Sequence, residues 1–111
     1  MKLPNADLLV IDPRKLRDYV LSTEHPVGRF KAAFFAALGF DSTTWEELAV
    51  ELRKLALAGR AETGERNAFG QKYLVHGRIT GPGGRVVDVV TVWIILEGQE
   101  VPRLVTLYPE G

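Results

Sequence analysis

Residues 24–40 read EHPVGRFKAAFFAALGF and place one of the two histidines of the chain directly before an amphipathic segment. Pro26 suits a first helical position, because proline lacks a backbone N–H and its φ is already near the helical value. Apolar residues then recur at helical spacing, at Val27, Phe30, Phe34, Ala37 and Leu38. The segment therefore predicts a helix over residues 26–38 whose apolar stripe supplies part of the core.

His25 and Lys31 are the first candidates for chemistry in this segment. His25 stands just before the first turn, where free backbone N–H groups and the helix dipole favour an anion such as phosphate. On a helical wheel Lys31 falls beside the stripe and is expected to be held, whereas Arg29 falls opposite and is expected to be solvated. The commoner interpretation is a capping or surface histidine and a lysine whose stem lies along apolar surface. Both interpretations stay open at this point.

Length and composition limit the classes of protein to consider. The 111 residues are enough for one domain, residues 1–111, with a modest core. There is no cysteine, which excludes disulfides, thiolate metal sites and cysteine nucleophiles. We find no signal peptide and no apolar run of membrane-spanning length, so we expect a cytoplasmic chain that does not enter a membrane. The 14 basic and 14 acidic residues argue against a bulk nucleic-acid coat protein, although a site for one phosphate fits this balance.

Two further helices are predicted on either side of this segment. Asp12 is placed to cap a short helix that begins at Pro13 and ends near Leu21. Residues 41–59 predict the longest helix, which Gly59 ends. Its start has the spacing of a capping box, formed by Thr43 with Glu46 or by Thr44 with Glu47.

The second half of the chain reads as strands. Residues 60–69 predict a polar edge strand, 70–80 and 85–96 a hairpin around a Gly-Pro-Gly-Gly turn, and 103–108 a last strand. The fold class is therefore α+β, with three N-terminal helices followed by a three- to four-stranded, mostly antiparallel sheet.

The hairpin has a predicted core face and a predicted polar face. Pairing Gly81 with Gly84 turns seven residues toward the core: Tyr73, Val75, Ile79, Val86, Val90, Val92 and Ile94. The opposite face then holds Lys72, His76, Arg78, Thr91 and Trp93. Such a face is most often simply solvated. Alternatively it is an RNA-binding groove in which a base stacks on Trp93.

The motifs of the chain together resemble a known family. LPNAD, HPVGRFKAAFFAALGF, GQKYLVHGRITGPGGR, TVWII and PRLVTLYP span nearly the whole sequence. They resemble a small bacterial domain family of unknown function that is associated with toxin-type systems and polymorphic toxins. That family is similar in layout to the barnase, EndoU, colicin and RelE (BECR) ribonucleases, so the resemblance implies a BECR-like fold.

The resemblance also implies an activity and a set of site residues. The activity is metal-independent RNA cleavage through attack of the 2′-hydroxyl, with neither a metal nor a cofactor. The implied residues are His25, Lys31, Thr91 and Thr106 for catalysis, and Lys72, Arg103 and Tyr108 for the substrate; the groove interpretation adds His76 and Trp93. His25 would take the 2′ proton, Lys31 with Lys72 or Arg103 would offset phosphate charge, and the threonines and Tyr108 would position it.

A non-catalytic alternative remains. The chain would then be a protein-binding module that docks a partner through the Trp93 face or through its last strand, whose edge could also pair with a second copy of the chain. The partners to expect are accordingly RNA, a small antitoxin or immunity protein, and a homodimer mate. A metal nuclease is disfavoured, because the acidic residues form no cluster in sequence and the two histidines lie far apart.

Overall fold

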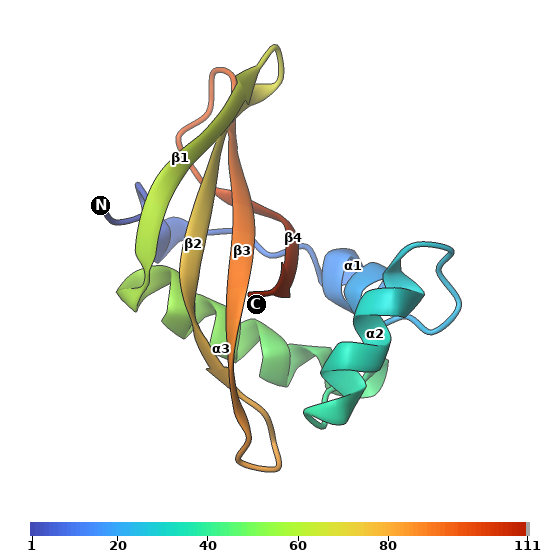
Figure 1. Cartoon of the computed structure of the whole chain (residues 1–111). Coiled ribbons are helices and arrows are strands. Elements are labelled where there is room, and N and C mark those ends of the chain that lie inside the picture. Colours follow the sequence, from blue (N-terminus) through green and yellow to red (C-terminus); the bar gives the residue numbers. More distant parts are fainter. Residues whose placement is uncertain (111) are drawn as a thin grey trace.

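Helical segments fill the first half of the chain and one antiparallel sheet fills the second half (Figure 1). The structure, a computed structural model, describes residues 1–110. The helical segments are η1 (Ala6–Leu8), α1 (Pro13–Lys15), the π-helical turn η2 (Leu16–Val20), α2 (Gly28–Ala37), η3 (Ser42–Thr44) and α3 (Trp45–Ala58). The strands are β1 (Arg60–Asn67), β2 (Gly70–Thr80), β3 (Val86–Leu96) and β4 (Arg103–Pro109). The predicted α+β class, with helices N-terminal to the sheet, is confirmed.

The sheet has the order β1-β2-β3-β4, so each strand pairs with its neighbour in sequence. We call the face that α3 covers the inner face, and the opposite one the outer face. Figure 1 shows α2 to the side of the sheet, beyond the edge formed by β4. Val10 pairs with the first residue of β4 as a short parallel bridge, so the lead-in segment covers part of that edge. Within residues 1–110, no helix is long and apolar enough to cross a membrane.

The loop between β2 and β3 sets the register of the central hairpin. Thr80 pairs with Val86, the Gly81 N–H donates to the Arg85 carbonyl at 2.8 Å, and the Gly84 N–H donates to the Gly81 carbonyl at 2.9 Å. Three residues therefore form the loop, and Gly84 has a φ of +90°, the left-handed conformation that such a loop requires. The predicted pairing of Gly81 with Gly84 is wrong by one residue. A shift of one residue turns every side chain of β3 to the other face of the sheet.

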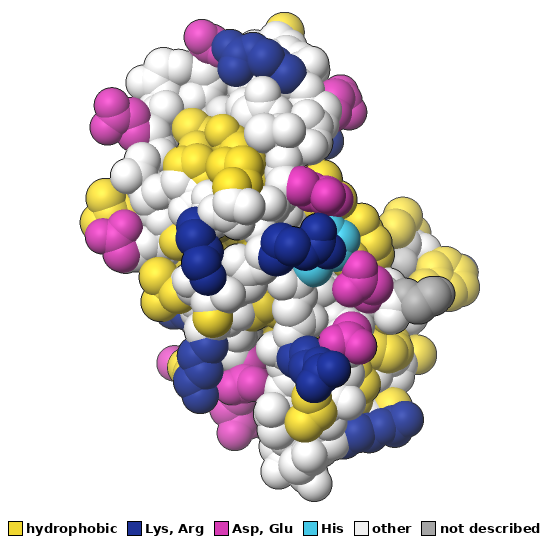
Figure 2. Space-filling model, turned by 60° about the vertical axis from the view of Figure 1, so that its left-hand side comes forward, with side chains coloured by type: hydrophobic (Ala, Val, Ile, Leu, Met, Phe, Trp, Pro, Cys, Tyr) yellow, Lys and Arg dark blue, Asp and Glu magenta, His cyan; other side chains and the backbone are white. Residues whose placement is uncertain are grey.

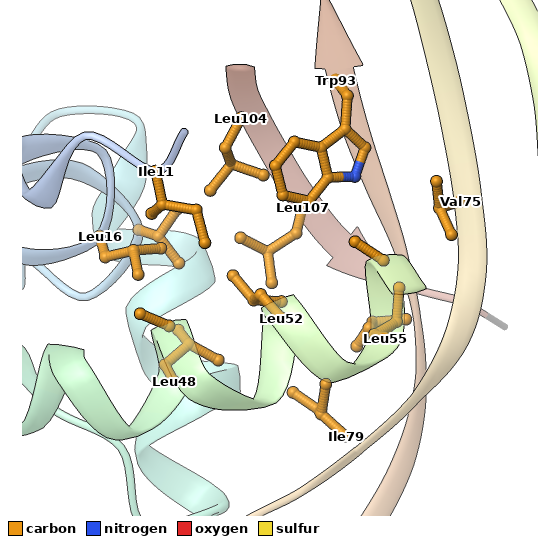
Figure 3. Packing of buried hydrophobic residues seen from close by; sticks show 14 of the residues in the cluster. Ile11, Leu16, Leu48, Leu52, Leu55, Val75, Ile79, Trp93, Leu104 and Leu107 are labelled. Carbon is orange, nitrogen blue, oxygen red and sulfur yellow. The ribbon is translucent and has the colours of Figure 1, made fainter. Parts of the chain in front are cut away.

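Thr91 and Trp93 consequently lie in the core and not on an exposed face. Both are fully buried on the inner face, where the Trp93 indole lies beside Leu104 and Leu107 (Figure 3). The indole Nε1–H donates to Thr91 Oγ1 at 2.8 Å, and the Thr91 hydroxyl donates to the Val75 carbonyl at 3.1 Å. The predicted groove with Trp93 as its stacking platform is therefore wrong. The four aliphatic residues of β3 that were predicted to face the core under the helices instead lie on the outer face: Val86, Val90, Val92 and Ile94. Val90 is nevertheless only 3% exposed there, whereas Val86 is 53% exposed.

The buried face of α2 also differs from the predicted stripe. Gly28, Ala32 and Phe35 are buried, whereas Val27 and Phe30 are 57% and 70% exposed. The reason is close packing against η2, since a Cβ on Gly28 would lie 1.9 Å from the Tyr19 carbonyl oxygen. The face of α2 that holds Gly28 therefore packs inward, because only a residue without a side chain fits against Tyr19, although the predicted stripe carries more apolar surface. Helix α2 also begins two residues later than predicted.

Aspartates start both other helices. The Asp12 carboxylate accepts the Arg14 N–H at 3.0 Å, as predicted, and its hydrogen bonds with Arg14 lower its pKa to about 2. The predicted capping box of threonine with glutamate is wrong. Asp41 instead accepts from the N–H groups of Thr43 and Thr44, and the Asp41 N–H donates to Thr44 Oγ1 at 3.0 Å. Asp41 thus performs the capping, two residues before the first of the two threonines that were predicted to do so.

The buried hydrogen-bond chain around Thr91 makes a stability prediction. Thr91→Val keeps the volume but leaves the indole N–H and the Val75 carbonyl without their partner, so we expect a loss of about 1–3 kcal/mol in the free energy of unfolding. Thr106→Val is the matched control, because Thr106 Oγ1 is buried without a hydrogen-bond partner. We expect no loss in that variant. Urea unfolding measures both, and equal losses in the two variants would contradict the prediction.

Candidate functional site

His25 caps α2 with its ring. The backbone N–H groups of Val27 and Gly28 both donate to His25 Nδ1 at 3.0 Å, and the His25 N–H donates to Ser22 Oγ at 3.2 Å. The edge of the imidazole packs against the Tyr19 ring, with the two centroids 4.8 Å apart. Since Nδ1 is the acceptor, the capping ring carries its proton on Nε2. Two of the N–H groups that were expected to bind a phosphate are thus used by the protein itself.

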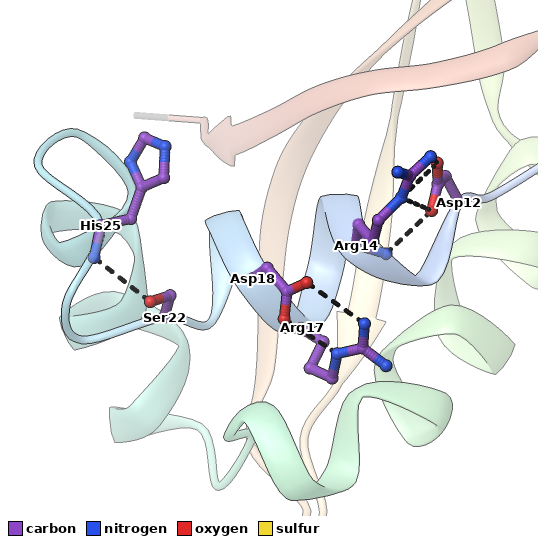
Figure 4. Close-up of polar contacts among 6 residues, drawn as sticks. All are labelled: Asp12, Arg14, Arg17, Asp18, Ser22 and His25. Carbon is purple, nitrogen blue, oxygen red and sulfur yellow. Dashed lines mark hydrogen bonds and ion pairs between the residues drawn. The ribbon is translucent and has the colours of Figure 1, made fainter.

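An open hollow of about 580 Å³ borders this loop. It is lined by Arg17, Asp18, Ser22, Thr23, Glu24, His25 and Ser42. The Arg17 guanidinium donates to the Asp18 carboxylate at 2.8 Å (Figure 4), and this pairing lowers the pKa of Asp18. Because Asp18 neutralises Arg17, the hollow is polar but lacks the excess positive charge that a phosphate group needs.

Lys31 connects α2 to the edge strand β4. Its Nζ donates to the Leu107 carbonyl at 3.1 Å and lies 5.7 Å from the centroid of the Tyr108 ring. Burial of the ammonium lowers the pKa of Lys31 from its ordinary value. As expected, Lys31 is held while Arg29 is exposed. The contact brings together residues that are 76 positions apart in sequence.

The outer face carries most of the other predicted site residues, arranged in rows across the strands. Pairing of the strands places Arg60, His76, Val90 and Tyr108 in one row, Glu62, Leu74, Val92 and Thr106 in the next, and Lys72, Ile94 and Arg103 in a third. Tyr108, at the end of β4, is the residue of these rows that lies beside Lys31. Lys72 and Arg103 lie two rows from Tyr108, about 13 Å along the strands. The Arg103 guanidinium there donates to the Gln99 side chain at 3.3 Å.

The nine predicted residues therefore fall into separate groups. Lys31 and Tyr108 meet at the C-terminal end of β4, Thr106 lies one row from Tyr108, and His76 lies in the row of Tyr108 with Val90 between them. Thr91 and Trp93 lie on the inner face and cannot touch a ligand on the outer one. The catalytic and binding roles that were predicted for the remaining residues stay predictions.

His76 has two carboxylate partners that sequence reasoning missed. Its Nδ1 lies 2.7 Å from Glu110 Oε1, and its Nε2 lies 3.0 Å from Glu62 Oε1. The hydrogen bond to Glu62, followed by that to Glu110, raises the pKa of His76 above its ordinary value of 6.5. The same bond lowers the pKa of Glu62. The register of β1 on β2, which places Glu62 one row from His76, is the signal that could have found the first of these partners.

Charges of both signs share the surface around this site. On the face seen in Figure 2, Lys and Arg side chains are interspersed with Asp and Glu side chains, and neither sign forms a continuous area. Arg78, for example, donates to Asp88 at 3.0 Å. Among residues 1–110, no three His, Asp or Glu side chains are grouped so that they could hold a metal ion.

Comparison with known proteins gave one family and one structural neighbour of note. The profile of a family described as "Domain of unknown function (DUF6883)" matches residues 2–111. No curated protein matches the chain. A chain of a solved structure titled "Contact-dependent growth inhibition toxin - immunity protein complex from Klebsiella pneumoniae 342" has a TM-score of 0.68 and 16% sequence identity. The similarity covers 96% of this chain and 97% of that chain, and at this identity it shows a shared fold.

The hydrogen bonds by which His25 caps α2 predict an effect of His25 on stability, which can be measured separately from any effect on activity. His25→Ala removes the acceptor of two N–H groups, so we expect α2 to fray and the free energy of unfolding to fall by about 1 kcal/mol. His25→Asn is the matched control, because its Oδ1 can accept at the same two positions while it lacks the imidazole. We expect it to keep most of the stability in urea unfolding. A loss in His25→Asn as large as that in His25→Ala would contradict the cap.

Proposed function

Given that this chain belongs to the DUF6883 family of domains of unknown function, we propose that it is a toxin-type endoribonuclease domain that cleaves RNA without a metal ion. The observation that carries the proposal is the fold shared, over nearly the full length of both chains, with a chain of a contact-dependent growth inhibition toxin and immunity protein complex. The same observation supports a protein partner, such as an immunity protein, for this chain.

Lys31 is the centre of the proposed site. One of its three N–H donors is used by the Leu107 carbonyl, which leaves two that can face an anion. Its partial burial strengthens its interaction with a negative charge, since the effective dielectric is lower there than in water. In RNA cleavage by the 2′-hydroxyl, the phosphorane gains negative charge, so an ammonium in this position stabilises the transition state.

Tyr108 and Thr106 extend the site along the outer face. Tyr108 is 36% exposed and its ring lies beside the Lys31 ammonium, so a base can stack there while its phosphate meets the cation. Thr106 occupies the next position along β4 on the same face. Its hydroxyl is buried, however, so Tyr108 takes the place of Trp93 as the stacking surface for the nucleotide.

His25 has a narrower role in this proposal than as a general base. Acceptance of the 2′ proton at Nδ1 would require the loss of both capping hydrogen bonds. The Nε2–H is outside the cap and can donate to a phosphate oxygen. His25 therefore fits the role of a hydrogen-bond donor and not that of the base, so in this proposal the 2′ proton passes to solvent water.

A protein-binding module remains the second candidate. It is favoured by the balance of charges on the surface, which differs from the continuous positive area that a nucleic-acid-binding face usually carries. In this alternative the chain engages a partner protein and depends on neither Lys31 nor His25 for chemistry. Pairing of two copies through the edge of the sheet also remains a prediction.

RNA cleavage by the purified chain tests the proposal. We expect fragments with 2′,3′-cyclic phosphate ends to form from total RNA in the presence of EDTA. Lys31→Met should slow cleavage by about 10²–10³-fold, because it removes the charge that stabilises the phosphorane. In the wild type, cleavage should decline as the pH rises through the lowered pKa of Lys31, because the ammonium is then lost.

Lys54→Met provides the matched control. Lys54 is exposed on α3 and pairs with Glu51 at 3.3 Å, far along the chain from β4. It should cleave RNA at the wild-type rate, and circular dichroism should show the same fold in both variants. Intact RNA with the wild-type chain, or equal rates with Lys31→Met and Lys54→Met, would reject the ribonuclease and favour the protein-binding module.

A further inference from the structure

We propose that His76 is a positioning residue that fastens the C-terminal end of β4 to β1 and β2, and thereby keeps Tyr108 and the Leu107 carbonyl where they meet Lys31. We call the contacts of His76 with Glu62 and Glu110 the clasp. The consequence for cleavage rests on the proposed function, whereas the clasp itself is independent of it.

The clasp spans the sheet. The Glu110 N–H donates to the Asp88 carbonyl at 3.0 Å, which extends the pairing of β4 with β3 by one residue. From there the Glu110 carboxylate reaches across to Nδ1 of His76 on β2, at 2.7 Å. The other ring nitrogen meets Glu62 on β1 at 3.0 Å. One imidazole on β2 thus contacts two further segments, whose acidic residues are 14 and 34 positions from it in sequence.

The end of β4 depends on such a contact because β4 is an edge strand. Its first half is held on the free side by Val10, which bonds with Pro102 and Leu104 at 2.9 and 3.0 Å. At its second half the free side receives the Lys31 ammonium at Leu107. The end of an edge strand frays readily, because neighbouring elements hold it on one side only. The clasp fixes the last described residue, and so holds Tyr108 between two anchored positions.

The clasp requires an imidazolium ring. Each ring nitrogen faces a carboxylate, so both must carry a proton to donate. A neutral ring has one N–H and one lone pair, and the lone pair would then repel the oxygen of one carboxylate. The other charged or titratable side chains that share this face are Arg60 on β1, Lys72 and Arg78 on β2, Asp88 on β3, and Arg103 and Tyr108 on β4, with Lys31 of α2 beside Tyr108. Arg78 and Asp88 neutralise each other at 3.0 Å.

The pH range of the clasp follows from the directions of the two shifts. The pKa of His76 is raised in the folded chain, so the stabilisation is fully present below the ordinary value of 6.5 and is lost as the pH rises through the raised pKa. The pKa of Glu62 is lowered, so on the acid side its contribution is lost only as the pH falls through that lowered value. The clasp therefore opens on the alkaline side.

Hydrogen exchange resolved along the chain tests the clasp without RNA. The amides of residues 106–108 and 110 are followed over a pH series, corrected for intrinsic exchange, while NMR of the His76 ring reports its titration. In the wild type we expect exchange in this segment to become about 10-fold faster as His76 loses its proton. The expected change is no larger because the two carboxylates are partly exposed, which weakens their hydrogen bonds with the ring. In Glu110→Gln, which removes one carboxylate, the segment should exchange fast throughout and show no step linked to His76.

Glu97→Gln is the matched control, because Glu97 pairs with Arg66 at 3.3 Å at the other end of the sheet. It should retain the wild-type step. The inference would be overturned if the exchange rates of this segment do not change as His76 titrates. It would also be overturned if Glu110→Gln shows the same change as the wild type.

The clasp and the ribonuclease fail separately. If the step in exchange is present but the wild-type chain cleaves no RNA, the proposed function is wrong and the clasp stands. If Lys31→Met abolishes cleavage while Glu110→Gln leaves both the exchange step and the pH profile of cleavage unchanged, the clasp is wrong and the function stands. If the clasp and the ribonuclease are both correct, the cleavage rate of the wild type should fall as His76 loses its proton. In Glu110→Gln this fall should be absent.

Discussion

The hydrogen bond between the Gly81 N–H and the Arg85 carbonyl closes the β2–β3 loop, and the two faces of the sheet depend on this closure. It fixes Thr80 opposite Val86, and the alternation of side chains then carries Thr91 and Trp93 to the inner face. There they form the buried chain of hydrogen bonds that ends at the Val75 carbonyl. The core under α3 is assembled around this chain, so a shift of one residue in the loop would turn it to the outer face and turn Val90 and Val92 toward α3 in its place.

The outer face is what this register leaves for function. It brings His76 and Tyr108 into one row with Val90 between them, and it leaves Thr106 beside them on β4. Helix α2 is placed next to this row by a separate constraint, the close approach of Gly28 to the Tyr19 carbonyl. The two constraints together bring the Lys31 ammonium to the Leu107 carbonyl. The candidate site thus arises where a helix fixed by a glycine contact meets a strand fixed by a hairpin register.

The two histidines of this region make hydrogen bonds that stabilise the fold. His25 uses Nδ1 to start α2, and His76 uses both ring nitrogens to hold Glu62 and Glu110. Neither histidine is thus a free base in the folded chain. Lys31 joins α2 to the edge of the sheet and still has donors available. The proposed chemistry accordingly centres on a cation and an aromatic ring.

The sequence by itself determined the class and order of the elements, because alternation, helical spacing, the Asp12 cap and the Gly-Pro-Gly-Gly turn are local signals. It also indicated that Lys31 is held. The tertiary structure alone decided which face of β3 is buried, which side of α2 packs inward and which acids meet His76. The first depends on one hydrogen bond across a turn, the second on a backbone contact at Gly28, and the third on residues 14 and 34 positions away. Local patterns carry no information on such distances, since packing and register set them only when the whole chain is folded.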